Sequence, residues 1–180
     1  MRAAFPALLL LALPLAGQGA RSYALSGESV AVYNIAGVVR VEGGRGGAVT
    51  VAVTPTGADA GRLSVETGDL RGRNTLRVVY PGDRIVYPAL GHGSNSNFTI
   101  RADGTWGDDD HRWGRGEGRK VTIRGSGDGL EAAADLTVSV PEGRRVAIYL
   151  GVGRIEATNV NGCLLYTSDA ADEEDSVDLG

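Results

Sequence analysis

The sequence VAVYNIAGVVRVEG (Val30–Gly43) has the same pattern as VAIYLGVGRIEATN (Val146–Asn159), and this repeat predicts the fold. Both copies begin Val-Ala-apolar-Tyr, carry a glycine at the eighth position (Gly37 and Gly153) and place an apolar residue two positions later. A glycine there permits positive φ and a sharp bend between two short strands. Such strand–glycine–strand repeats are typical of a β-solenoid, in which each coil lies on the previous one and shares its core. Two copies are few for a repeat array, so chance similarity within a glycine- and valine-rich chain is the alternative.

The rest of the chain also predicts short strands separated by glycine-rich turns. The 180 residues include 28 glycines and 42% hydrophobic residues, and the Val, Ile and Leu runs are short, with no long amphipathic helical pattern. This composition predicts an all-β, β-solenoid-like fold of stacked short strands. The segment Gly129–Leu136 is compatible with a helix but short, and we interpret it as strand or turn. The expected strands are Val30–Tyr33, Val38–Val41, Val49–Val53, Leu63–Glu66, Thr75–Tyr80, Asn97–Arg101, Lys120–Arg124, Leu136–Val140, Arg145–Leu150 and Arg154–Ala157.

Residues 1–20 have the pattern of a secretory signal peptide. Arg2 precedes an apolar run over residues 3–15, and small residues follow near Ala20, where we expect cleavage. The run is short for a membrane span, and its two prolines disfavour the alternative of a buried helix. No later segment is long enough to cross a membrane. We therefore expect an exported protein, located in the periplasm, at the cell surface or outside the cell, with no transmembrane segment in the mature chain.

The C-terminal stretch CLLYTSDAADEEDSVDLG (residues 163–180) differs in character from everything before it. It holds the only cysteine and six acidic residues, with no lysine or arginine. It resembles the in-frame translation of a transposase-type sequencing adapter, with CLLYTSDAADE and SVDLG flanking a short variable index. We therefore expect residues 163–180 to be an artefactual, disordered tail, and the domain of residues 21–162 to be truncated at its C-terminus. A genuine acidic interaction tail is the alternative.

The charge and the cysteine count depend on this tail. Without its six acids and without Arg2, the formal charge changes from −4 to +1. A nearly neutral domain argues against nucleic acid as a partner. Without Cys163 the chain has no cysteine, so an exported domain would rely on its core and its strand ladders and not on disulfides.

The segment LTVSVPEGRRVAIYLGVGRIEATNVNG (Leu136–Gly162) resembles the core signature of an adhesin-like family of bacterial proteins of unknown function. YNIAGVVRVEG (Tyr33–Gly43) is similar to that family's opening unit, and the resemblance extends over about residues 23–162. It implies an exported β-solenoid-like or twisted multi-strand domain. The motifs consist of valine, glycine and proline patterns, so they imply a fold more than an activity. Further coils normally follow the point at which this resemblance ends.

Polar chemistry is concentrated in RADGTWGDDDHRW (Arg101–Trp113). Carboxylates on a loop can hold Ca²⁺, and exposed tryptophans can stack on a sugar ring. Consecutive side chains of an extended segment point to opposite faces, however, and the spacing does not match a known calcium loop. A solvated loop with one tryptophan packed on the core is therefore the favoured interpretation. The candidate metal ligands are Asp108, Asp109 and Asp110, and the candidate ligand-binding residues are Trp106 and Trp113.

The remaining polar residues predict no catalytic or cofactor-binding group. His92 and His111 are the only histidines and lack a zinc-type spacing. Four arginines cluster in GDLRGRNTLRVVYPGDR, and ordinary solvent-facing positions alternating with Leu and Val are the favoured interpretation, with binding of an anionic surface glycan or lipopolysaccharide as the alternative. These arginines are Arg71, Arg73, Arg77 and Arg84.

Two function hypotheses follow. The first is an exported, non-enzymatic β-protein with an adhesive, surface or scaffolding role, whose partner is a surface glycan or another protein. The alternative is a carbohydrate-active enzyme or polysaccharide-binding module on a parallel β-helix, with Asp108–Asp110 as its carboxylate cluster. We also expect an unpaired strand edge at Val152–Gly162, which favours self-association.

Overall fold

The computed structural model describes residues 19–107, 118–160 and 163–168. Within them the fold is all-β, as the composition predicts, with twelve strands in two open sheets. The only helices in this part of the chain are two 3-10 turns, η1 (Ala60–Arg62) and η2 (Pro88–Leu90). Neither is long and apolar enough to cross a membrane.

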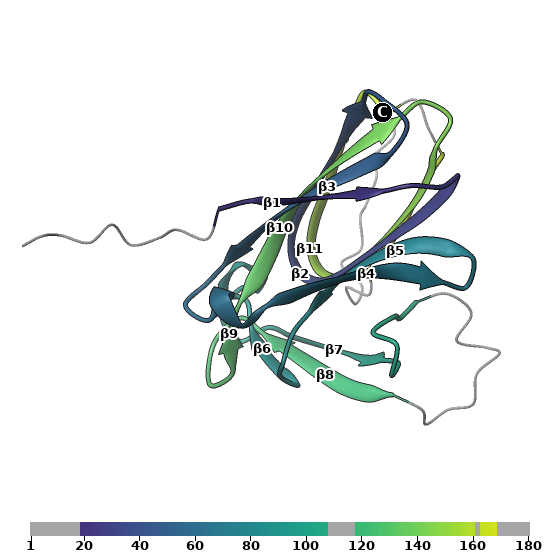
Figure 1. The fold of residues 1–180 in the computed structure, drawn as a ribbon. Helices are drawn as coiled ribbons and strands as arrows, with labels where there is room; N and C mark the ends of the chain where they lie inside the picture. The colour runs from purple at the N-terminus through teal and green to yellow at the C-terminus, as the bar shows by residue number, and fades with distance from the viewer. Residues whose placement is uncertain (1–18, 108–117, 161–162, 169–180) are drawn as a thin grey trace, which may run out of the picture.

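The larger sheet, sheet A, contains eight strands. Their order is β1-β3-β10-β2-β11-β12, with β5 beside β2 and β4 beside β5. Figure 1 shows the β4–β5 hairpin between the long strands of this sheet and the smaller sheet B. The strands are β1 (Arg21–Leu25), β2 (Ser29–Gly44), β3 (Val49–Thr56), β4 (Ser64–Leu70), β5 (Arg73–Val79), β10 (Ala133–Pro141), β11 (Arg145–Thr158) and β12 (Cys163–Ser168).

Strands β2 and β11 are the longest, and they contain the two copies of the repeat. They run parallel in register, with Tyr149 opposite Tyr33 and Gly153 opposite Gly37. Before Gly37 the other neighbour of β2 is β5, and after it the neighbour is β10. Sheet A therefore has two wings that share the bent strands β2 and β11. The two similar sequences are also neighbours in space, which chance similarity would not require.

The expected strands are found, with changes at their ends. Each of the ten segments overlaps a strand, but the two segments of each repeat copy form one continuous strand that bends at its glycine. Strands β1, β6 (Arg84–Val86) and β12 were not expected, whereas β9 (Leu130–Glu131) and the start of β10 lie in Gly129–Leu136, the segment interpreted as strand or turn. The sheet is mixed, because β1–β3, β3–β10 and β4–β5 pair antiparallel whereas β2 pairs parallel with its neighbours. The two wings are thus not built from successive parallel coils alone.

Part of the C-terminal stretch forms a strand, whereas a disordered tail was expected. Cys163–Ser168 form strand β12 and are not disordered, because they satisfy the free backbone edge of Arg145–Leu150 in parallel pairing. Leu164 packs half-buried against the core. Residues 169–180 lie outside the described residues.

The expected open edge is found in the second half of β11. Strand β12 pairs only with Arg145–Leu150, and residues 152–158 pair with β2 on their other side. No other strand of the described segments pairs with residues 152–158. Among the described strands, the backbone groups along that edge are therefore unpaired, and such an edge is a template for pairing with another chain.

The core consists mainly of aliphatic side chains, which alternate inward along β3 and β10, whereas residues 30–37 of β2 and 146–152 of β11 are all buried. Val32 and Ile148, which are cross-strand partners in the repeat, are 0% exposed, and so are Val51 and Val138 of the facing wing. These strands therefore enclose one continuous interior, which carries most of the hydrophobic stabilisation.

A buried polar pair supports the bend in β2. The Asn34 side-chain amide donates to the carbonyl oxygens of Ala134 (2.7 Å) and Ala36 (3.1 Å). The Tyr80 hydroxyl lies 2.9 Å from Asn34 Oδ1 and 3.0 Å from the Ala36 carbonyl oxygen. A sharp bend takes backbone groups out of the strand ladder, and buried groups of this kind need other partners. Asn34 and Tyr80 supply those partners.

The smaller sheet, sheet B, lies against one wing through aromatic contacts. Trp106, which follows β7 (Asn95–Ile100) in the chain, lies 5.2 Å from Tyr33 and 5.4 Å from Phe98 between ring centroids. Tyr33 in turn stacks on Tyr149 at 4.3 Å. The strand order is β7-β8-β6-β9. The strands are β6 (Arg84–Val86), β7 (Asn95–Ile100), β8 (Arg119–Arg124) and β9 (Leu130–Glu131).

Candidate functional site

The outer face of sheet B carries only polar side chains on β7 and β8. Along β7, Phe98 and Ile100 point into the core while the alternate residues are exposed. The antiparallel register places Asn97 opposite Thr122. Cross-strand partners share a face of the sheet, so the outward side chains form one surface. Its members are Asn95, Asn97, Thr99, Lys120, Thr122 and Arg124.

A shallow groove crosses one end of this face. Its volume is about 350 Å³, and it is open to solvent. We call it the sheet B groove. Its walls are hydroxyl, amide and guanidinium groups together with backbone, and it contains no carboxylate. The lining residues are Gly93, Ser94, Asn95, Asn97, Thr122, Arg124 and Ser126.

Two loops close this end of the groove, and glycine allows them to meet. A Cβ on Gly125 would lie 1.7 Å from the carbonyl oxygen of Gly91, so only a glycine fits there. The Gly125 N–H donates to the Ser94 carbonyl oxygen at 3.1 Å, and the Ser94 N–H donates to that of Gly91 at 3.2 Å. The two loops therefore hold Ser94 and Ser126 beside the strand residues.

Hydrogen bonds orient the amides of the groove and leave several donors free. Thr122 Oγ1 donates to Asn97 Oδ1 at 2.7 Å, and Asn97 Nδ2 contacts Asn95 Oδ1 at 3.4 Å. These bonds fix which end of each amide faces solvent. The side chains of Ser94, Arg124 and Ser126 make no hydrogen bond or ion pair with the described part of the chain. They are available to a ligand.

The face is cationic. Lys120 and Arg124 are exposed on β8, and the register of β6 with β8 places Arg84 beside Thr122. None of these three cations is paired with a carboxylate of the described segments. Asp83, the nearby acid in sequence, is instead engaged by Arg119 at 2.6 Å. Within the described segments no carboxylate pairs with these cations, and such a positive face favours anionic ligands.

The arginine cluster expected from the sequence is divided between the two sheets. Arg71 pairs with Asp103 at 3.1 Å, Arg77 pairs with Glu66 at 3.1 Å, and Arg73 donates to the Tyr149 hydroxyl at 3.1 Å. Of these four arginines, only Arg84 lies on the cationic outer face of sheet B. Arg71 is exposed, as the solvent-facing interpretation expects, although it also forms an ion pair, whereas the side chain of Arg77 is only 15% exposed.

Asp103 is held ionised by its surroundings. Burial alone would raise its pKa, but hydrogen bonds from Thr105 and the charges of Arg71 and Arg101 outweigh burial and lower the pKa. Thr105 Oγ1 donates to Asp103 at 2.6 Å. Through Arg71, this carboxylate ties the segment before Trp106 to the turn between β4 and β5, and it has a structural role.

The other residues singled out by sequence do not form a site in the described structure. Trp106 is only 4% exposed, and its ring packs on Tyr33 and Phe98, so it cannot stack on a sugar. It is the tryptophan packed on the core that the loop interpretation expects. Within the described ranges, no three His, Cys, Asp or Glu side chains are placed to hold a metal ion. Asp108, Asp109, Asp110, His111 and Trp113 lie outside the described residues.

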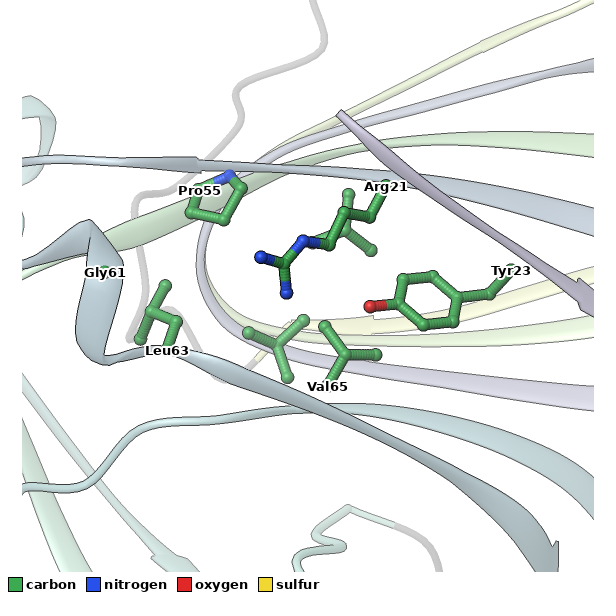
Figure 2. A pocket seen from close by; sticks show the side chains of 8 residues that line it. Arg21, Tyr23, Pro55, Gly61, Leu63 and Val65 are labelled. Atoms are coloured by element: carbon green, nitrogen blue, oxygen red, sulfur yellow. The ribbon is translucent and has the colours of Figure 1, made fainter. Parts of the chain in front are cut away.

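A second cavity lies between the β1–β3 pair and the β4–β5 hairpin. Its volume is about 80 Å³. Val53 and Val78, both buried, form its floor, and Leu63 and Val65 form one wall. We call it the β1 cavity. Figure 2 shows the Arg21 guanidinium and the Tyr23 ring pointing into it from strand β1.

Comparison with protein-family models, with curated proteins and with solved structures finds no match to this chain.

Sequence reasoning missed the residues of the sheet B groove. The alternation in NSNFTI (Asn95–Ile100) does predict which side chains point outward. It does not predict that β7 and β8 pair, because residues 101–118 separate them in the chain. The cation and amide groups become neighbours only through that pairing.

Proposed function

We propose that this protein is an exported, non-enzymatic β-protein of the adhesin-like type that it resembles, and that the outer face of sheet B binds a surface glycan. The observation that carries the proposal is the open polar groove between β7 and β8. A ligand site without a deep apolar cavity suits a hydrated polymer better than a small apolar molecule.

The chemistry of the groove supports a sugar ligand. Asn95, Asn97 and Thr122 supply amide and hydroxyl groups that both donate and accept hydrogen bonds, as sugar hydroxyls do. Arg124 adds a planar guanidinium that pairs with a carboxylate or sulfate through two parallel hydrogen bonds. Together with Lys120, this favours an acidic glycan over a neutral one.

The scaffold behind the groove supports a surface or scaffolding role. We propose that the parallel stack β2–β11–β12 is part of a β-solenoid-like arrangement, with Gly37 and Gly153 at equivalent corners. In such an arrangement each coil adds length without altering the core. The groove would then lie on one side of a stiff support, as an adhesive face requires.

Binding to an array of acidic and neutral glycans tests the proposal. We expect acidic glycans to bind, with an affinity that falls as salt concentration rises. Arg124→Ala should weaken that binding about tenfold, because it removes a charge-assisted hydrogen bond. Asn97→Ala should weaken binding of acidic and neutral glycans alike.

Arg45→Ala is the matched control, since Arg45 is exposed in the β2–β3 loop, far in sequence from the groove, and makes no described ion pair. It should bind like the unmodified protein. Glycan binding that is equally reduced in Arg45→Ala and Arg124→Ala would contradict the assigned face. Release of new reducing ends from the bound glycan would favour the enzyme hypothesis instead.

A further inference from the structure

The β1 cavity combines an apolar floor with a cationic mouth. Strand β1 presents Arg21 and Tyr23 on one face, because alternate residues of a strand share a face. Opposite them, Val65 pairs with Val78 in the β4–β5 hairpin. Figure 2 shows the guanidinium between the phenol hydroxyl on one side and Pro55 and Leu63 on the other, with Val65 beside the hydroxyl. The site therefore has a polar end and an apolar end.

Within the described ranges, no acidic group is paired with the charge at the polar end. Arg21 makes no hydrogen bond or ion pair with the part of the chain that the structure describes, and no carboxylate lines the cavity. Asp59, the acid beside η1, is 3.6 Å from Arg62. A guanidinium next to a phenol hydroxyl offers several donors to one anionic group, and a carboxylate matches the planar guanidinium.

The volume limits what the apolar end can hold. An apolar cavity of about 150 Å³ accommodates benzene, so the 80 Å³ found here accommodates about three or four carbons. A branched aliphatic group of that size would contact Val53, Leu63 and Val78. A long acyl chain would not fit.

We propose that the β1 cavity binds a small carboxylic acid with a branched hydrocarbon group, with the carboxylate on Arg21 and Tyr23 and the hydrocarbon on the valine floor. This site is distinct from the sheet B groove, which lies on the other sheet. Its occupant is a free small molecule and not a polymer, because the cavity has room for one short side group only.

Titration of the purified protein with isovalerate, followed by NMR of the backbone amides, tests this inference. We expect saturable shifts at Tyr23, Val53, Leu63 and Val65, with a dissociation constant on the order of millimolar, because so small a ligand has few atoms with which to bind. Acetate lacks the branched group and isovaleramide lacks the charge. Each should bind at least about tenfold more weakly than isovalerate.

Arg21→Gln should reduce isovalerate affinity to that of isovaleramide, and Tyr23→Phe should reduce it by a smaller factor. Arg62→Gln is the matched control, because Arg62 lies on η1 but does not line the cavity, and it should leave affinity unchanged. The inference is overturned if isovalerate and isovaleramide bind equally, if Arg21→Gln has no effect, or if the shifted amides lie elsewhere. Tighter binding of the tripeptide Gly-Gly-Leu than of isovalerate would also overturn it, in favour of a peptide C-terminus.

Discussion

Gly153 lies directly against Gly37, and neither position has room for a side chain. A Cβ on Gly153 would lie 1.8 Å from the Gly37 carbonyl oxygen, and a Cβ on Gly37 would lie 2.0 Å from the Ala134 carbonyl oxygen. Both glycines have a φ of 139°, which side-chain-bearing residues rarely adopt. The backbones of β11, β2 and β10 therefore stack at one bend, and this contact sets the angle between the wings of sheet A.

Gly153→Ala should destabilise the fold strongly. The new methyl group would meet backbone atoms at a φ that only glycine tolerates, so we expect a loss of about 3 kcal/mol or more in the free energy of unfolding. Urea denaturation measures this loss. Gly68→Ala in β4 is the control, since its Cβ would meet nothing within 4 Å and its φ is not positive. Equal losses for the two variants would disprove the stacked bend.

Tyr80→Phe should destabilise the bend by a smaller amount. Removing the hydroxyl leaves Asn34 Oδ1 buried without its 2.9 Å partner, which costs about 1–3 kcal/mol. Tyr87→Phe is the control, because no hydrogen bond between the Tyr87 hydroxyl and the described residues is found. A loss for Tyr87→Phe as large as that for Tyr80→Phe would contradict the assigned role of the Asn34–Tyr80 pair.

The same tyrosine should make stability depend on alkaline pH. Burial raises the pKa of Tyr80 well above its ordinary value of 10.0, although hydrogen bonds to backbone oppose the effect. The unfolded chain therefore loses this proton at a lower pH than the folded chain, so stability is retained below pH 10 and falls as pH rises above it. The free-energy difference between the unmodified protein and Tyr80→Phe should then shrink with rising pH. Urea denaturation at a series of alkaline pH values measures it, and a constant difference would refute the prediction.

Trp106 should behave as a core residue in fluorescence. In a Trp113→Phe variant it is the only tryptophan, and with 4% exposure it should be poorly quenched by acrylamide. Trp106→Ala should cost about 3–5 kcal/mol, because it removes the ring between Tyr33 and Phe98. Adding an acidic glycan that binds in the array experiment should leave the Trp106 emission unchanged. A shift on glycan addition would instead indicate that the ring contacts sugar.

Deleting residues 163–180 should leave a folded domain that self-associates more. The deletion removes β12 and the partial burial of Leu164, so we expect the free energy of unfolding to fall by about 1–2 kcal/mol. The core residues of β2 and β11 remain, so the domain should still fold. It also frees the edge at Arg145–Leu150, which joins the edge already open at residues 152–158. Size-exclusion chromatography over a range of concentrations measures the association. Deletion of residues 169–180 keeps β12 and is the control, and complete unfolding of the longer deletion would show that β12 is essential.

The repeat copies show which parts of the fold can be predicted from sequence patterns. The shared pattern around Gly37 and Gly153 predicted strands, a bend and inward aliphatic residues, because alternation and glycine act over a few neighbouring residues. It missed β1, whose RSYAL carries little alternation, and β12, whose pairing depends on a free edge that no local pattern records. The pairing of β3 with β10 likewise joins segments that are distant in the chain.

Local backbone preference and the period of hydrophobic residues are enough to predict the all-β fold class, the repeat and the two bends. Long-range strand pairing was needed to place the repeat copies in register and to bury Trp106. The same pairing places Arg124 and Asn97 in one groove and Arg21 and Val78 in one cavity. The physical reason is that a binding surface depends on which strands pair. Pairing is selected by the summed packing and hydrogen bonding of segments that are far apart in the chain.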